Sequence, residues 1–579
     1  MEDNVGRTRQ GRASRAHSSA RKELAANAPP PKRGRREDEQ PTVEEPQPQP
    51  QPNNEDEEPN VQEDSYPGGP SDLSLLKNYY KHRANPIWDT QHNDPILHRS
   101  LRCIVSANKV IKIQKPTQDW FWQYIIASGL ESLVRTNFNV LDYGLLWAFA
   151  ERWHPETSTF HLPIGEMGIT LDDVQCLLHI SIQGKFLNHV KISRPDGAQM
   201  LSSYLGIDEG DALDMFATLK GPYLTHSYVQ GLFMDYLDAA KTAFANNAPM
   251  HKVRMYRERC VRAFLLFVVG CTIFSNKTSY YLDVVYIQYF ADLSSVHEWN
   301  WGSAALVHLQ NYLDFASQAQ ASQLAGYMSL FEGWIITHFP TLSMWQLETN
   351  FTENMPLNAK FAPGQGHKDS RGYRQSIDNI QVSDVVFSPY DNRRHIRPLI
   401  DVCWFSGWLR CGNLKAKHLP ERVLRQFKYV QGIPRDPDVS TPNMNIFEID
   451  RVWAEEMDMR LIDENMRGQP VVNAWDCEPR YVLWFYKVSH PKMCPLEASE
   501  DQPRPPKLEV LLEESQQRHD PNPLGICRRV RDEVERALDA GEAEPGTPVH
   551  GTLRKILNML NPCLTYKRIS RGRRGGRRG

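Results

Sequence analysis

Four side chains that can bind a transition metal lie close together in the chain: His154, His161, Cys176 and His179. Imidazole nitrogens and thiolates are ligands that zinc prefers. However, the chain has no Cys-x-x-Cys pair, and His154 and His161 are not at a standard ligand spacing. Cys176 is more simply a small core residue. We therefore expect no metal site. We also expect Cys403 and Cys411, which flank Trp and Phe residues, to belong to the core.

Other catalytic chemistries lack their sequence motifs. A pyridoxal enzyme needs a Schiff-base lysine, an acidic partner and a phosphate cup, and no Gly/Ser-rich loop follows a strand to form that cup. Phosphate loops of the GxxxxGK and GxGxxG types are missing, as are the Asp/His/Asn ligand motifs of a metal-dependent phosphatase. Counting acids does not decide on a DDE-type transposase, but the helical pattern argues against one. We predict a non-enzymatic protein without a cofactor.

Lys32, Arg33, Arg35 and Arg36 form a compact cationic cluster near the start of the chain. The surrounding residues 1–70 lack hydrophobic periodicity, so we expect a disordered N-terminal region. A basic cluster on an accessible tail is typical of a nuclear import signal. A solvated charge run is the alternative. We expect nuclear localisation.

The chain ends in an Arg/Gly tail that contains Arg571, Arg573, Arg574, Arg577 and Arg578. Because 67 Lys and Arg stand against 70 Asp and Glu, for a net charge of -3, the whole molecule has no basic field. Nucleic-acid contact therefore has to be local, weak and sequence-blind. A simply solvated terminus is the other interpretation. Aromatic groups such as Trp120 to Tyr124 could stack on bases, but helical spacing favours a core role for them.

The elements that would position these residues are mostly helices. Helical spacing covers the dense apolar region from about residue 73 to 492, and brief strand-like segments occur at 384–387 and 481–486. We predict helices at 120–131, 141–153, 255–274, 303–317, 326–338 and 420–429, with two shorter ones near 526–538 and 553–560.

Neither a βαβ alternation nor an internal repeat is present, so the predicted fold is mostly α, with a few short strands and disordered tails. The domains are expected at 1–70 (disordered, with the basic cluster), 71–495 (one large helical domain) and 496–579 (a loosely structured extension). The longest apolar run, 263–269, is far shorter than the roughly 20 residues of a membrane span. We expect no membrane contact. Met1 is followed by a polar, Arg-rich stretch, so we also expect reduced cysteines in the cytosol or nucleus.

The most informative stretch runs from Phe160 to Leu178, here called the signature segment. Pro163 and Gly165 predict a turn after a short extended piece. Thr170 is placed to cap a helix, with Asp173 three residues on in a capping box. The apolar residues of that helix should face inward. No step of this interpretation requires chemistry.

The signature segment resembles that of the plant mobile domain family, also labelled "aminotransferase-like". The resemblance extends to other blocks, from roughly residue 95 to 492. His179-Ile180 departs from the Gly-Leu that many members carry, which puts the local turn in doubt. The other blocks that carry the resemblance are Arg152–Thr159, Gly270–Phe274, Trp299–Ala304, Arg422–Phe427 with Gln431–Pro434, and Tyr481–Phe485 with Ser489–Pro491.

The resemblance implies a plant nuclear factor that serves meristem maintenance, genome integrity and silencing of transposons. It also implies a possible association with a serine/threonine phosphatase of the PP7 type. The first hypothesis is thus a nuclear scaffold or adaptor. The alternative is a transposon-encoded accessory protein or an enzyme that acts directly on DNA.

Overall fold

The computed structural model describes residues 69–89, 101–494, scattered positions between 527 and 543, and 547–570. Within these residues no helix is both long and apolar enough to cross a membrane. The basic cluster at 32–36, the tail at 571–578 and most of the expected helix at 526–538 lie outside the described residues.

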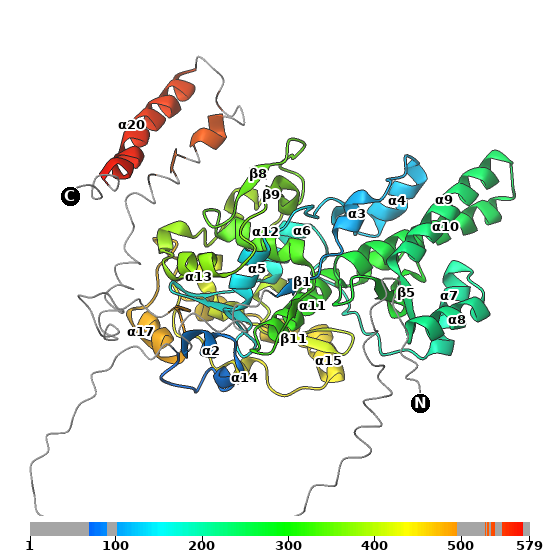
Figure 1. Ribbon diagram of the computed structural model, residues 1–579, viewed down its shortest axis with the longest axis horizontal. Coiled ribbons are helices and arrows are strands. Elements are labelled where there is room, and N and C mark those ends of the chain that lie inside the picture. The colour runs from blue at the N-terminus through cyan, green and yellow to red at the C-terminus, as the bar shows by residue number, and fades with distance from the viewer. Residues whose placement is uncertain are drawn as a thin grey trace, which may run out of the picture. The chain divides into compact units, whose positions relative to one another are not determined.

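Helices make up most of the described chain, as Figure 1 shows, which confirms the mostly α prediction. The α-helices are α2 (Ala84–Asp89), α3 (Asn108–Lys112), α4 (Asp119–Ala127), α5 (Tyr143–Ala150), α6 (Leu171–Leu178), α7 (Arg194–Leu205), α8 (Glu209–Leu219), α9 (His226–Ala245), α10 (Met250–Cys271), α11 (Trp301–Ala316), α12 (Met328–His338), α13 (Arg371–Asp378), α14 (Pro437–Ser440), α15 (Ile446–Glu455), α16 (Glu464–Arg467), α17 (Pro479–Val488) and α20 (Pro548–Ser570).

In the described part of the chain the strands are short and form five small sheets rather than one large one. The three-stranded sheet is antiparallel in the order β2-β3-β4, with Trp153 opposite Phe160 and Phe160 opposite Met167. The strands are β1 (Arg102–Cys103), β2 (Trp153–His154), β3 (Thr159–Leu162), β4 (Gly165–Met167), β5 (Tyr223–Thr225), β6 (Tyr281–Asp283), β7 (Gln323–Leu324), β8 (Trp345–Leu347), β9 (Phe361–Pro363), β10 (Gly407–Cys411) and β11 (Leu414–His418).

The core surrounds this three-stranded sheet. Every residue of α12 is buried, as are all the residues of β2, β3 and β4. Apolar residues on most sides of α12 keep it in the core, and its Glu332 and His338 form buried hydrogen bonds there. Phe160 stacks on Phe331 and Trp334 of α12, with ring centroids 5.7 and 4.9 Å away, so aromatic contacts join the sheet to the central helix.

The predicted helices at 120–131, 141–153, 255–274, 303–317 and 326–338 correspond to α4, α5, α10, α11 and α12. The prediction at 553–560 falls within α20. Cys403 and Cys411 are buried in the main core, as expected. Boundaries differ by several residues because helix ends depend on caps and tertiary contacts.

Three predicted elements were wrong. The strand expected at 481–486 is helical, within α17, because Pro479 begins a helix and Tyr481, Phe485 and Val488 are spaced for one face. Residues 384–387 contain the end of a 3-10 turn (Val382–Asp384) and no strand. The helix expected at 420–429 is two 3-10 turns, Pro420–Arg422 and Leu424–Phe427, separated at Val423, where φ is -132°.

The beginning and the end of this domain pack together. Leu76, Tyr79 and Ala84 form one small apolar cluster with Val488 and Met493. Two hydrogen bonds reinforce it: the Asp72 amide and the Ser71 hydroxyl donate to the Lys487 carbonyl, at 2.9 and 3.3 Å.

Candidate functional site

The signature segment folds as β3, a tight turn, β4 and then α6. Gly165 lies in the turn with φ +107°, a conformation that favours glycine. A β-carbon there would also lie 2.5 Å from Arg425 Nη2 and 2.9 Å from Tyr481 Oη. The glycine is therefore required by the backbone and by the approach of two buried side chains.

The helix cap predicted at Thr170 is present. The Asp173 amide donates to Thr170 Oγ1 at 3.2 Å, and the Thr170 amide donates to Asp173 Oδ2 at 2.7 Å. His338 and Tyr390 add hydrogen bonds to Asp173 Oδ1, at 2.9 and 2.7 Å. Burial alone would raise the pKa of Asp173, but the hydrogen bond and charge of His338 hold that pKa below its ordinary value. The apolar residues predicted to face inward, Leu171, Val174, Leu177 and Leu178, are buried.

The second acid of the signature segment, Glu166, is held by Arg422. Arg422 Nε and Nη2 donate to the two Glu166 oxygens, each at 2.7 Å, and Thr159 Oγ1 donates at 2.8 Å. Both partners of this pair are buried. Burial would raise the pKa of Glu166, whereas Arg422 keeps it lower than usual. A bidentate pair of this kind fixes β4 against the Pro420–Arg422 turn.

Two further buried ion pairs flank the sheet. Arg152 Nη2 donates to Asp378 Oδ1 at 2.5 Å, and Arg374 donates twice to Glu151, at 2.7 and 2.6 Å. These contacts tie α5 and the residues before β2 to α13. The carboxylates of these residues around the signature segment are therefore each paired with a buried arginine or histidine.

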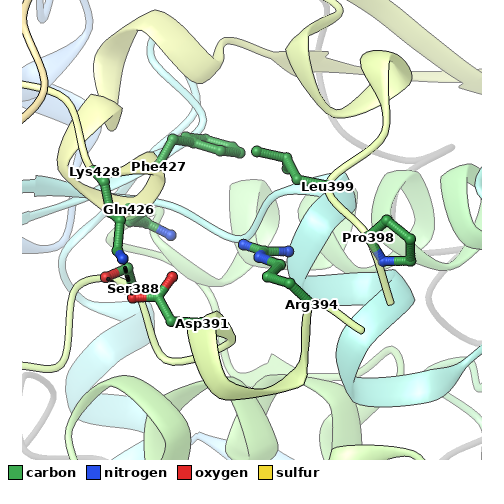
Figure 2. Close-up of a pocket in the computed structure, with 8 residues that line it drawn as sticks. All are labelled: Ser388, Asp391, Arg394, Pro398, Leu399, Gln426, Phe427 and Lys428. Carbon is green, nitrogen blue, oxygen red and sulfur yellow. Dashed lines mark hydrogen bonds and ion pairs between the residues drawn. The ribbon is translucent and has the colours of Figure 1, made fainter. Parts of the chain in front are cut away.

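Beside the signature segment is an open pocket of about 320 Å³. Lys428 pairs with Asp391 at 2.8 Å, and Arg394 donates to both oxygens of Asp172, at 2.7 and 2.8 Å. Gln426 turns the other way and exchanges two hydrogen bonds with the Gly168 backbone, each at 2.8 Å. Figure 2 shows the residues that line the pocket: Ser388, Asp391, Arg394, Pro398, Leu399, Gln426, Phe427 and Lys428.

The chemistry of this pocket is that of a contact surface. Its two cationic side chains are each neutralised by a carboxylate. The one hydroxyl among the lining residues, Ser388 Oγ, donates to Asp391 Oδ2 at 3.2 Å, and that carboxylate is already paired with Lys428. It can accept an apolar or hydrogen-bonding group beside Phe427 and Leu399.

Arg425, within the Arg422–Phe427 block, is a buried cation to which the sequence patterns assign no role. Its guanidinium lies over the rings of Phe387 and Tyr481, with centroids 4.6 and 5.7 Å away. None of its three guanidinium nitrogens has a hydrogen-bond partner among the described residues. Ring faces therefore supply its main favourable contacts.

The four residues weighed as zinc ligands separate into two places. His154 lies near His161, with ring centroids 4.3 Å apart, and next to His490, with the Nε2 atoms 2.5 Å apart. Cys176 instead faces Asp172 on α6, and burial raises the pKa of its thiol well above the ordinary value. His179 ends α6, and burial lowers its pKa to about 3.

The fold and the site together define a large helical domain organised around a buried hairpin, a capped helix and internal ion pairs. A family model for the plant mobile domain matches residues 129–486, which is more than half of the chain. The chain belongs to the plant mobile domain family. The expected resemblance is thereby confirmed.

Three relatives from Arabidopsis thaliana illustrate the similarity. Protein MAIN-LIKE 2 is 28% identical over 379 residues, which cover 64% of this chain and 53% of that protein. Protein MAINTENANCE OF MERISTEMS is 27% identical over 372 residues, covering 61% of this chain and 71% of that protein. The third, Serine/threonine-protein phosphatase 7 long form homolog, is 25% identical over 461 residues, covering 74% of this chain and 32% of that protein.

The match therefore spans about half of MAIN-LIKE 2 and about a third of the phosphatase homolog. No solved structure matches the chain.

Proposed function

We propose that the chain is a nuclear, non-enzymatic scaffold or adaptor that serves meristem maintenance, genome integrity and transposon silencing. Membership of the plant mobile domain family and the similarity to MAINTENANCE OF MERISTEMS support the developmental part of this role. The nuclear part rests on the basic cluster Lys32, Arg33, Arg35 and Arg36.

One structural observation carries the scaffold role. The acids of the signature segment accept hydrogen bonds from buried partners, Glu166 from Arg422 and Asp173 from His338 and Tyr390. An acid engaged in this way holds the fold and is not poised to transfer protons to a substrate. Function then falls to the exposed surface and to the tails.

A phosphatase of the PP7 serine/threonine type is the partner we propose. The support is the similarity to the relative named as a phosphatase 7 homolog, of which the match occupies only 32%. In that relative the matched stretch is joined to further sequence in one polypeptide. Two parts that are joined in one protein can instead bind each other as separate chains in another case.

The partner proposal is tested by recovering the tagged full chain from plant nuclei and identifying the bound proteins by mass spectrometry. We expect a reproducible set of proteins that includes a PP7-type phosphatase. The purified chain, incubated with plasmid DNA or phosphopeptides and divalent metal ions, should turn over neither. Cleavage or joining of DNA would overturn the scaffold role in favour of the alternative, an accessory protein or enzyme acting directly on DNA.

Nuclear entry is tested separately with a fluorescent fusion. Changing Lys32, Arg33, Arg35 and Arg36 to Ala should move the fusion out of the nucleus. The matched control changes Arg7, Arg9, Arg12 and Arg15, which removes the same charge from the same end of the chain. Equal nuclear accumulation of both variants would refute this cluster as the import signal.

A further inference from the structure

Three histidines from distant parts of the sequence meet in the core. His82 precedes α2, His154 ends β2, and His490 follows α17. Their exposed fractions are 3%, 1% and 0%. One ring nitrogen from each lies within 4.8 Å of the corresponding nitrogens of the other two.

Within the part of the chain that the structure describes, some ring nitrogens in this histidine cluster lack ordinary hydrogen-bond partners. His154 Nε2 and His490 Nε2 face each other at 2.5 Å, which places a proton between the two nitrogens, and a zinc ion bound by both would set them about 3.3 Å apart. His490 Nδ1 has no hydrogen-bond partner among the described residues, although it is buried. A buried polar atom without a partner is costly, and it often marks a ligand that completes the site.

The environment favours neutral imidazoles, which is the form that binds metals. The rings of His82 and His154 stack with centroids 4.1 Å apart, and those of His154 and His490 meet edge to face at 4.6 Å. Three neutral imidazoles that converge without a carboxylate among them suit a borderline transition metal better than calcium or magnesium.

We propose that His82, His154 and His490 form a binding site for a divalent transition metal, with zinc as the expected ion. This donor set goes beyond the local spacing of His154 and His161, because His82 and His490 come from the two edges of the domain. His161 is near, but its ring nitrogens contact Ser489 Oγ and Thr157 Oγ1, at 2.7 and 3.1 Å.

His82 shows how the site would be oriented. Its Nε2 lies 2.9 Å from the Trp153 carbonyl, and its Nδ1 accepts from the Ala84 amide at 3.1 Å. A neutral imidazole that binds an ion through one nitrogen carries its proton on the other, so the ion would replace the Ala84 amide at Nδ1, and Nε2–H would keep donating to the Trp153 carbonyl. A backbone hydrogen bond to the second ring nitrogen is the usual support for a metal-binding histidine.

The role assigned to the ion is structural. All three side chains are buried, and the apolar cluster of Leu76, Tyr79 and Val488 lies where the two ends of the domain meet. A metal held by residues 82, 154 and 490 would fasten both ends of the domain to the central sheet. This inference is independent of the proposed adaptor function.

The first test uses the full chain, purified with a tag that contains no histidine and without chelator. Elemental analysis should find about one zinc ion per chain. After removal of the metal, cobalt(II) should produce visible absorption bands of a nitrogen-ligated, low-coordinate ion. Zinc should raise the thermal midpoint of the stripped chain, and chelator should lower that of the loaded chain.

The second test assigns the ligands. His82→Gln, His154→Gln and His490→Gln should each abolish the cobalt spectrum and the zinc-dependent shift of the thermal midpoint. His308→Gln is the matched control, because His308 is also buried among aromatic rings but lies outside the cluster. The control should keep both signals.

Two results would overturn the proposal. The first result concerns the unaltered chain. If this chain binds neither zinc nor cobalt, and its thermal midpoint responds to neither metal nor chelator, the cluster is only a hydrogen-bonded stack of imidazoles. Since this measurement needs no variant, it stands even if the substitutions prevent folding. The second result is metal binding that survives all three substitutions, which would place the ion elsewhere in the chain.

Discussion

His179 ends α6 in the left-handed region, with φ +55° and ψ +29°. The family resemblance predicts glycine where this chain has histidine, and the left-handed turn is nevertheless present. A side chain in this conformation is strained by roughly 1–2 kcal/mol relative to the right-handed region. The turn after α6 is therefore formed, with His179 in the left-handed conformation that glycine usually adopts.

We expect His179→Gly to be more stable than His179→Ala by about 1 kcal/mol, because only glycine relieves the left-handed strain. Urea unfolding of the two variants measures this difference. Comparing glycine with alanine removes the effect of losing the imidazole itself. Equal free energies of unfolding would show that the backbone at this position is not strained.

Glu332 on α12 gives a prediction on pH. Burial raises its pKa from 4.5 to about 8, and within the described part of the chain its oxygens accept a hydrogen bond from the Asp142 amide alone, at 3.1 and 3.3 Å. The folded chain therefore holds this proton more tightly than the unfolded chain. The stabilisation is complete below pH 4.5 and is lost as the pH rises toward and through about 8.

Glu332→Gln should remove this loss because an amide does not ionise. The difference in free energy of unfolding between the variant and the unaltered chain should shift in favour of the variant between pH 5 and pH 8.5. Glu131→Gln, at a surface ion pair with Arg135, should show no such shift over the same range. A constant difference for Glu332→Gln would mean that Glu332 is already ionised at pH 5.

At the scale of elements, α6 depends on its cap and its buried face. Thr170→Ala should cost about 0.5–2 kcal/mol because it removes the bond to the Asp173 amide. Leu177→Ala should cost about 2–5 kcal/mol because it leaves a cavity in the core. Ser193→Ala, which removes the exposed capping box of α7, provides the comparison for Thr170. If neither change in α6 alters chemical denaturation, the signature segment is not structural.

The link between β4 and the Pro420–Arg422 turn rests on Glu166 and Arg422. Either Glu166→Leu or Arg422→Met alone should cost about 3–5 kcal/mol, because it leaves a buried charge unpaired. The double variant should recover much of that loss. The exposed pair Lys185–Glu298 should couple by no more than about 1 kcal/mol in the same cycle. Additive costs at Glu166 and Arg422 would contradict the ion-pair assignment.

The long helices were predictable because their apolar spacing is regular over many residues, as in α10 and α11. The Thr170 cap was predictable because all its atoms come from one turn of chain. The structure of short apolar runs was not predictable, because a run such as Tyr481 to Tyr486 fits a strand as readily as one face of a helix. The partners of Glu166 and Asp173 could not be found either, because only folding brings Arg422 and Tyr390 beside them.

The candidate metal site shows the same limit. His154 attracted notice through its neighbour His161, whereas His490 stands 336 residues further along the chain. Spacing rules detect ligands that one local element presents together. They do not detect ligands that three separate elements supply.

At the scale of the whole molecule, the Arg/Gly tail is expected to bind single-stranded RNA or DNA weakly and without sequence preference. Arg571, Arg573, Arg574, Arg577 and Arg578 lie among glycines, and the net charge of -3 provides no field to reinforce them. Guanidinium groups pair with phosphates, so binding should fall steeply as salt is raised.

A chain that ends at Tyr566 should lose most of this binding in fluorescence anisotropy at low salt. Replacing the five tail arginines with lysine keeps the charge and should preserve most of the affinity. Should the shortened chain bind as tightly as the full one, the folded domain itself carries the nucleic-acid surface, and the alternative of a DNA-acting protein gains ground.

The hydrogen bond between the Asp72 amide and the Lys487 carbonyl joins the first and last segments of the domain, so the polypeptide enters and leaves the domain at neighbouring points. A unit with adjacent entry and exit is portable: evolution can splice it into a host protein, or append sequence on either side, without disturbing its interior. The relatives fit such a history, since the matched stretch occupies 32% of one protein and 80% of another.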